Sequence, residues 1–284
     1  MRYQVAIVIP VWKVDITEFE KISFLQCCSV LHNYKIRLIS YQGVNLANYT
    51  DILKNKSVDY EIVFFDKSFF ESTDSYSKLM LSVRFYVTFM RFKYILIHQL
   101  DCFIFRDELE SWVKRGYSYI GAPWLKGYGQ AMPGDPVIGV GNGGLSLRNV
   151  SDHLRVLLSF SYIKKPRQLE RSFFSSRHVC MLSSLLSLFE SVINCNNSFF
   201  LFNGWSGNED LFWGKIASGN FSWFTVAEWE VAAHFSTEVH PRFFYELHRK
   251  ETPFGCHAWW TYDFEFWKPH IEKFGYNLIT HVDG

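Results

Sequence analysis

Strand-like and helix-like segments alternate through the first 124 residues, and this alternation constrains the fold more than any other feature. Segments rich in β-branched and aromatic residues occur at 3–9, 35–41, 60–65, 94–97 and 117–124. Apolar residues at helical spacing occur between them, at 17–32, 75–92 and 107–116. Such alternation is typical of a parallel sheet covered by helices. The sequence therefore predicts an α/β fold with a mixed, mostly parallel central sheet flanked by helices.

The pattern loosens beyond residue 124. We expect a Gly/Pro-rich loop at 127–144, a strand at 144–149 and helices at about 151–160 and 167–191, followed by an aromatic-rich, irregular last third. The chain shows no internal repeat and no low-complexity linker. We therefore expect a single domain over residues 1–284.

Composition and charge limit the classes of partner. Hydrophobic residues make up 48% and charged residues 20%, as in globular proteins. The net charge of +1 gives no electrostatic ground for nucleic-acid binding. A short basic cluster at 164–171 fits a solvated helix end or, second, peripheral contact with a membrane.

Cysteine spacing and hydropathy bear on the compartment. None of the six cysteines forms a C-x-x-C pair, so free buried thiols in a reducing compartment are expected. The segment "MRYQVAIVIPVWK" lacks the features of a signal peptide, and no stretch reaches the roughly 18 apolar residues of a spanning helix. The expected location is the cytoplasm, including the inner face of the membrane.

A single acid follows the strand expected at 94–97. In "YILIHQLDCFIFRD" the strand leads into His98, Gln99 and then Asp101. Ligands of α/β sheets bind beyond the carboxyl ends of the strands, where a carboxylate can hold Mg²⁺ or Mn²⁺ with a diphosphate. The alternative is an aspartate that caps a turn or a helix.

Two further segments carry candidate chemistry. In "NGWSGNEDLFWGKIA" the acids Glu209 and Asp210 open an amphipathic helix, either as ordinary N-terminal acids or as a general base beside an apolar wall. In "TPFGCHAWW", His257 is a packed histidine or, together with Asp101, a metal ligand.

The segment "GVGNGG" at 139–144 has the glycine spacing of a dinucleotide-binding loop. That fingerprint needs a strand before it and a helix after it, whereas strand-like "LSLRN" follows here. The segment is interpreted as a tight loop that lets a ligand approach the backbone, or as a bulged hairpin.

Five segments taken in order carry a resemblance to a known family. They are "LIHQLDCFIFRDELESW", "YSYIGAPW", "VGNGGLSLRN", "GNEDLFWG" and "PFGCHAW". With them the chain resembles the GT-A-type glycosyltransferases from about residue 5 to 257, and most of all a bacterial family of proposed sugar transferases catalogued as a domain of unknown function. The resemblance implies a GT-A-like single domain, with a nucleotide-sugar donor bound by about 1–124 and a glycan or lipid-linked glycan acceptor bound by about 125–284.

The resemblance also implies roles for single residues. Asp101 stands where these enzymes carry a D-x-D metal motif, although Phe103 replaces the second acid, and His257 resembles their C-terminal metal ligand, so Mn²⁺ or Mg²⁺ is implied. Asp210, with Glu209 second, resembles the base of inverting galactosyltransferases. Donor contacts are implied at Pro10, Val11, Lys78, Arg84, Gln99 and Asp101, and acceptor contacts at Trp124, Asn142, Gly143, Gly144, Trp205 and Asn208.

The implied function is therefore an inverting hexosyl transfer in bacterial surface polysaccharide synthesis. Lys78 and Arg84 are equally ordinary surface charges, and many of the aromatic residues belong to a core. A glycoside hydrolase would also use paired acids and aromatic residues. A non-catalytic carbohydrate-binding protein would explain the aromatic residues alone.

Overall fold

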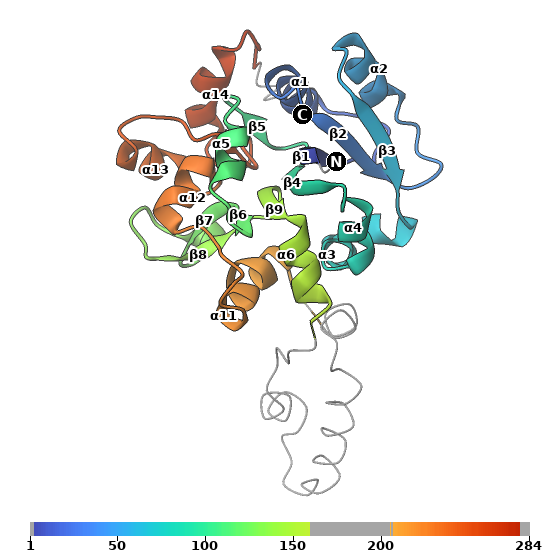
Figure 1. Cartoon of the computed structure of the whole chain (residues 1–284). Helices are drawn as coiled ribbons and strands as arrows, with labels where there is room; N and C mark the ends of the chain where they lie inside the picture. Colours follow the sequence, from blue (N-terminus) through green and yellow to red (C-terminus); the bar gives the residue numbers. More distant parts are fainter. Residues whose placement is uncertain (1–2, 160–204, 206, 279–284) are drawn as a thin grey trace, which may run out of the picture.

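The computed structural model describes residues 3–159, 205 and 207–278, and its centre is a six-stranded sheet (Figure 1). The strand order is β3-β2-β1-β4-β9-β6. Strands β3, β2, β1 and β4 are parallel, and β9 runs antiparallel to both β4 and β6. The predicted mixed, mostly parallel α/β sheet is confirmed. Its strands are β1 (Tyr3–Pro10), β2 (Lys35–Ser40), β3 (Tyr60–Phe64), β4 (Phe92–His98), β6 (Tyr119–Ile120) and β9 (Leu145–Asn149).

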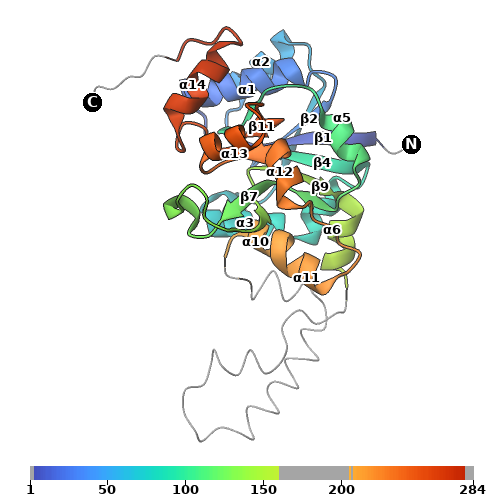
Figure 2. The ribbon, with the colours of Figure 1, turned by 90° about the vertical axis from the view of Figure 1, so that its left-hand side faces the viewer.

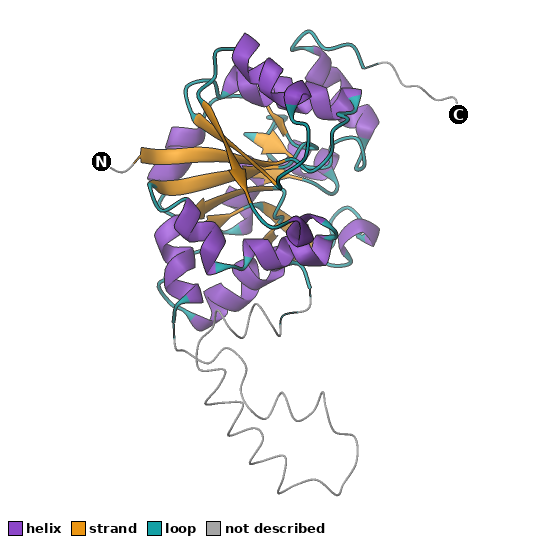
Figure 3. Cartoon of the chain, turned by 90° about the vertical axis from the view of Figure 1, so that its right-hand side faces the viewer, coloured by secondary structure: helices purple, strands orange, loops and turns teal. Residues whose placement is uncertain are grey.

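Helices cover both faces of this sheet (Figure 3). One face packs against α1 (Glu18–Val30), α2 (Ala47–Asn55), α5 (Leu109–Lys114) and α12 (Trp229–Phe235). The other packs against α3 (Thr73–Met80), α4 (Val83–Thr88), α6 (Val150–Leu157) and the helical run that starts at α10 (Glu209–Leu211). That run continues as a π-helical segment η3 (Phe212–Ala217) and α11 (Ser218–Asn220).

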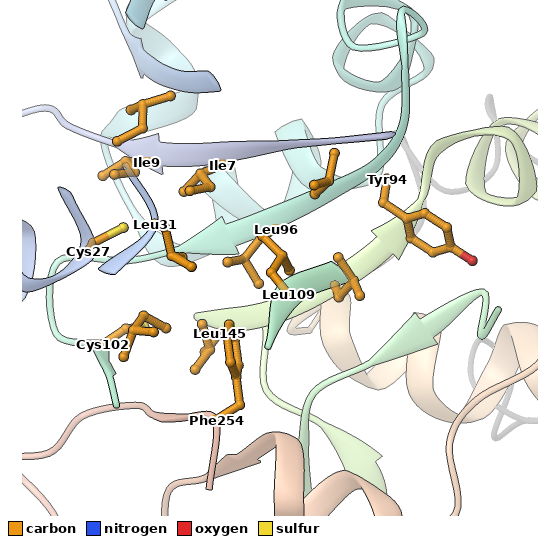
Figure 4. Packing of buried hydrophobic residues seen from close by; sticks show 14 of the residues in the cluster. Ile7, Ile9, Cys27, Leu31, Tyr94, Leu96, Cys102, Leu109, Leu145 and Phe254 are labelled. Atoms are coloured by element: carbon orange, nitrogen blue, oxygen red, sulfur yellow. The ribbon is translucent and has the colours of Figure 1, made fainter. Parts of the chain in front are cut away.

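Successive side chains of β1 point to opposite faces of the sheet, and all of them are apolar from Val5 to Ile9, which explains why this strand is central. Ile7 and Ile9 pack on the α1 face together with Leu96 of β4 (Figure 4). Ala6 and Val8 pack on the opposite face. All five are fully buried. A parallel strand covered on both faces requires such a continuous apolar run.

Two smaller sheets lie beside the central one. The first has the order β10-β11-β5, built from Ser236–Thr237, Gly255–Cys256 and Phe103–Ile104. The second pairs β7 (Ala122–Leu125) with β8 (Val137–Gly141). The remaining helices are η1 (Lys67–Phe70), η2 (Tyr128–Gln130), α13 (Pro241–Leu247) and α14 (Phe264–Glu272), with α13 and α14 on the same side of the molecule as α1 (Figure 2).

Several sequence expectations need correction. The helix expected at 75–92 is two helices, because Ser82 caps a new one by accepting a hydrogen bond from the Phe85 amide. The strand expected at 117–124 is divided between β6 and β7, which belong to different sheets. The loop expected at 127–144 contains β8, and α2 was not predicted. The helix expected at 167–191 lies outside the described residues.

Two further properties of the described residues follow. Cys27, Cys28, Cys102 and Cys256 are free and buried, while Cys180 and Cys195 lie outside these residues. No helix in this part of the chain has the length and apolar character to cross a membrane.

Candidate active site

The register of the sheet β10-β11-β5 brings three distant segments together. Cys256 of β11 lies opposite Phe103 of β5 and beside Thr237 of β10. Glu238 directly follows β10, His257 directly follows β11, and Asp101 lies two residues before β5. One end of a small sheet thus gathers an imidazole and two carboxylates.

His257 is held between these carboxylates. Its Nδ1 lies 2.9 Å from Glu238 Oε1, and its Nε2 lies 3.2 Å from Asp101 Oδ1 and 3.3 Å from Gln99 Oε1. Burial lowers the pKa of His257, but Asp101 and Glu238 together raise it to about 10. The ring therefore carries a positive charge wherever no other cation lies between the carboxylates.

The chemistry of this cluster fits a divalent cation. Donor atoms of Asp101, Cys102 and His257 all lie within 4.8 Å of one another. Asp101 Oδ1 is buried and lies 3.2 Å from His257 Nε2. Burial raises the pKa of Cys102, whose Sγ donates to the Gly144 carbonyl at 3.2 Å, and a soft sulfur ligand does not suit the hard cations Mg²⁺ and Mn²⁺. Asp101 and His257 are then the two residues suited to hold Mn²⁺ or Mg²⁺.

Asp210 lies at the start of α10 with its carboxylate against backbone amides. Oδ2 accepts hydrogen bonds from the amides of Asn142 at 3.0 Å and Gly143 at 3.3 Å, and Oδ1 accepts one from Leu211 at 2.8 Å. Burial nevertheless raises the pKa of Asp210 above its ordinary value, because it outweighs these bonds. A fixed carboxylate with a raised pKa is suited to accept a proton.

Glu209, the neighbour of Asp210, is engaged by an arginine. Its two oxygens accept hydrogen bonds from Arg148 at 2.8 and 3.0 Å, and both side chains are buried. Arg148 also donates to Tyr86 Oη at 3.3 Å and to Ser146 Oγ at 3.0 Å. This bidentate pair connects β9 to α10 and thereby fixes the position of the neighbouring Asp210.

The loop 142–144 joins the two clusters. A Cβ atom on Gly143 would overlap the Glu209 carboxylate, and one on Gly144 would overlap the ring of His257. Asn142 adopts a φ of 69°, and its Oδ1 accepts a hydrogen bond from the Gly144 amide at 3.0 Å. Since β8 and β9 belong to different sheets, the loop is not a hairpin, and no helix follows it directly.

Three cavities meet at Gln99. Asp210 and His257 line a cavity of about 140 Å³, Asp101 lines one of about 260 Å³, and Tyr76 lines one of about 340 Å³. All three are lined by Gln99, and the two larger ones share Trp12. The cavities therefore open around the carboxyl ends of β1 and β4.

The structure gathers most of the residues singled out from the sequence around these cavities. The gathered residues are Gln99, Asp101, Asn142, Gly143, Gly144, Asn208, Glu209, Asp210 and His257. Others do not line them. Pro10, Val11 and Trp124 are buried, Lys78 and Arg84 are exposed, and Trp205 packs its ring against Phe212.

Sequence reasoning missed residues that the structure brings to the site. Glu238 and Tyr128 stand in segments without a recognisable motif, and Trp12 and Tyr76 were not distinguished from the many core aromatic residues. Arg148, which binds Glu209, was also missed. Its sequence did carry a signal, because a charged residue inside the expected strand "LSLRN" indicates a buried partner.

Comparison with solved structures found several weakly similar glycosyltransferases. Galactosyltransferase LgtC, in complex with donor and acceptor sugar analogues, is 13% identical, with a TM-score of 0.47 over 89% of this chain and 86% of that one. Core-mannan synthase A from Aspergillus fumigatus, in an Mn/GDP form, is 9% identical, with a TM-score of 0.43 over 81% and 72%. A glycosyltransferase involved in glycosylating the major capsid of PBCV-1 is 10% identical, with a TM-score of 0.42 over 95% and 99%. With TM-scores below 0.5, these likenesses carry no argument about activity.

Comparison with curated proteins gave no match. A family model does match, over residues 59–257, and so spans β4, the small sheet, the loop 142–144 and α10. The chain belongs to the family described as "Protein of unknown function (DUF5672)".

Proposed function

We propose that the protein is a glycosyltransferase that moves a sugar from a nucleotide-sugar donor to a hydroxyl group of a glycan. The observation that carries this proposal is the shared cavity of Asp210 and His257. A carboxylate with a raised pKa faces a cluster suited to a divalent cation, and Gln99 connects that cavity to the one containing Asp101. A proton acceptor beside a diphosphate site is the arrangement that such a transfer requires.

The charges around the cavities support a role for a divalent cation. Among the described residues that line the three cavities, the one lysine or arginine is Lys13, which lies 3.5 Å from Glu20. Six carboxylates line the same cavities, on Glu20, Glu71, Asp101, Glu209, Asp210 and Glu238. Arg148 and Lys13 pair with Glu209 and Glu20, and His257 is cationic, but the other four carboxylates outweigh this ring and would repel a nucleoside diphosphate. A cation held by Asp101 and His257 would supply the charge that neutralises the diphosphate, and Lys78 and Arg84 are too peripheral for that role.

The proposed step is a single inverting displacement. Asp210 accepts the proton of the acceptor hydroxyl while the oxygen of that group bonds to the anomeric carbon. The bond from the anomeric carbon to the phosphate oxygen breaks, and its electron pair leaves with the nucleoside diphosphate. The amides of Asn142 and Gly143 orient the Asp210 carboxylate. The buried Asn142 Nδ2, which has no hydrogen-bond partner among the described residues, is available to a ligand oxygen.

The structure supports the alternatives less well. A glycoside hydrolase needs two carboxyl groups that face one bond from opposite sides. Both oxygens of Glu209 are occupied by Arg148, and Asp101 and Glu238 are both in contact with His257. A non-catalytic carbohydrate-binding protein gives no reason for a raised pKa at Asp210.

The finer points of the proposal rest on the sequence resemblance. They are hexosyl transfer, a lipid-linked glycan as acceptor, bacterial surface polysaccharide synthesis, and a cytoplasmic location with peripheral membrane contact. Because the site suits a divalent cation, we expect such transfer to depend on Mn²⁺ or Mg²⁺ in the assay buffer.

The first test combines ligand binding with one substitution. Thermal melting with UDP, GDP, CMP, TDP and ADP, with and without Mn²⁺, should show a metal-dependent rise for one nucleotide by mass action. Asp210→Asn should keep that rise, and transfer from the matching nucleotide sugar should fall about 10²–10⁴-fold because the general base is lost. Full activity in this variant would disprove the role of Asp210. No rise with any nucleotide would contradict the transferase itself.

A further inference from the structure

We infer that Glu238 is the positioning residue of this site, because one carboxylate fixes the ring of His257 and also anchors the loop 126–136. The inference rests on the proposed function, since it concerns His257 as a residue that holds a cation. Nothing in the sequence pattern marks Glu238, and the structure alone brings it to the site.

Glu238 is engaged through both of its oxygens. Its side chain is buried, with Oε1 2.9 Å from His257 Nδ1 and Oε2 accepting a hydrogen bond from Tyr128 Oη at 2.8 Å. The preceding carbonyl, of Thr237, accepts a hydrogen bond from the His257 amide at 3.1 Å. Backbone and side chain of the same segment therefore hold both ends of the histidine.

This contact determines which nitrogen faces the cavity. A proton on Nδ1 donated to Glu238 leaves Nε2 directed at Asp101 Oδ1 and Gln99 Oε1. A histidine that binds a metal through one nitrogen commonly donates its other N–H to a carboxylate, which sets the tautomer and ring orientation. Without Glu238 the ring would lose the contact that fixes Nδ1, and Nε2 would be held less firmly toward Asp101.

The second oxygen extends the same control to the loop between β7 and β8. Tyr128 is 43% exposed, yet its hydroxyl reaches the buried Glu238. His240, two residues after Glu238, contacts the Ala131 carbonyl of this loop through its Nε2. The loop is thus tied to the segment 238–240 at two points, and one of them is shared with His257. Tyr128 also lines the cavity that contains Asp210.

The test measures Mn²⁺ affinity directly, by electron paramagnetic resonance of free Mn²⁺, in the presence of UDP, GDP or ADP in turn. Glu238→Ala should weaken Mn²⁺ binding about 10–100-fold, as removal of such a partner does elsewhere. Glu238→Gln should restore most of the affinity, because its amide oxygen still accepts a hydrogen bond from Nδ1. The matched control is Glu110→Gln, an exposed glutamate 3.0 Å from Lys114 on α5, which should change nothing.

A second variant tests the loop and does not depend on the stability of Glu238→Ala. Tyr128→Phe removes one of the two hydrogen bonds to Glu238. Amide exchange in 126–136 should become faster, and Mn²⁺ affinity should fall by less than in Glu238→Ala. Unchanged exchange and unchanged affinity would overturn the inference.

The outcomes separate this inference from the proposed function. Equal Mn²⁺ affinity in the wild type and in folded Glu238→Ala would overturn the role of Glu238 and leave the transferase proposal standing. A wild-type protein that binds no Mn²⁺ with any of these nucleotides would overturn the metal assignment and this inference with it. Mn²⁺ affinity kept in Glu238→Gln but lost in Glu238→Met, whose side chain has a similar volume but no oxygen to accept a hydrogen bond from Nδ1, supports positioning, because a mere packing role would respond to both alike.

Discussion

At the scale of single residues, adjacent acids acquire different chemistry from their surroundings. Glu209 and Asp210 are sequence neighbours at the start of one helix. Arg148 occupies both oxygens of Glu209 in a buried bidentate pair, whereas Asp210 meets backbone amides that carry no full charge. Of the two acids, Asp210 is therefore the one suited to accept a proton in the proposed transfer, and Glu209 is suited to hold it in place.

The raised pKa of Asp210 predicts a dependence of stability on pH. Because the folded-state pKa lies above the unfolded one, protonated Asp210 favours the fold below its ordinary pKa near 3.9, and this contribution is lost as pH rises through the raised value. At neutral pH, Asp210→Asn should therefore melt at a higher temperature than the wild type, and the difference should vanish in acid. Melting curves of both proteins from pH 3 to 8 measure it, since 1 kcal/mol corresponds to roughly 2–4 °C.

The control for this comparison is the exposed acid Asp74 in the first turn of α3. Asp74→Asn should show no gain in melting temperature at neutral pH. An Asp210→Asn variant that melts at or below the wild type at pH 7 would contradict the burial argument.

At the scale of elements, the helical run 209–220 packs directly on a strand. Gly214, in the π-helical segment, lies against the backbone of β8, and a Cβ atom there would overlap the Val140 carbonyl. Phe212 and Trp213, the two residues before it, are fully buried. Such close packing of helix on strand keeps Asp210 next to the loop that follows β8.

This packing predicts opposite effects for two glycines of the same run. Gly214→Ala should lower the free energy of unfolding by about 1–3 kcal/mol, because the helix must move away from β8. Gly219→Ala, where an added Cβ meets nothing within 4 Å, should be neutral or raise it by up to about 1 kcal/mol. Urea unfolding of both variants provides the measurement. Equal stabilities would show that β8 and the helix are not in close contact.

The elements also show how far the sequence could predict the structure. Central strands such as β1 and β4 were identified because burial on both faces demands continuous apolar residues. The break at Ser82 was missed, since its neighbours keep helical spacing and the hydroxyl cap becomes visible in the structure. Strands of two residues, such as β10 and β11, carry no periodic signal, and the position of Glu238 depends on their register.

At the scale of the whole molecule, the two predicted halves are interleaved. Strand β9, from the second half, lies inside the central sheet between β4 and β6. It pairs with β4 along the residues that lead to the site, from Tyr94 to His98. The candidate site likewise combines Asp101 from the first half with His257 from the second. Motifs such as "LDCF" and "GNED" were located from the sequence, but which residues meet depends on this interleaving.

The interleaving predicts that residues 1–124 do not form a stable domain. Without β9, the backbone of β4 loses one hydrogen-bonded neighbour, and the apolar face beneath α6 is exposed. The fragment should lack near-UV circular dichroism and a cooperative melting transition, while the full chain should melt in a single step. A fragment that unfolds cooperatively would show that the first half is an independent unit.

The contact between His257 and Gln99 also has a consequence for biosynthesis. The two residues are 158 positions apart in the chain. At roughly 5–20 residues per second, the ribosome delivers the histidine about 8–30 seconds after the glutamine. During that interval Asp101 lacks the imidazole of His257, and in its first part, until Leu145–Asn149 is made, β4 also lacks its neighbour β9. The nascent chain therefore passes through a period in which the edge of β4 lacks its native neighbour.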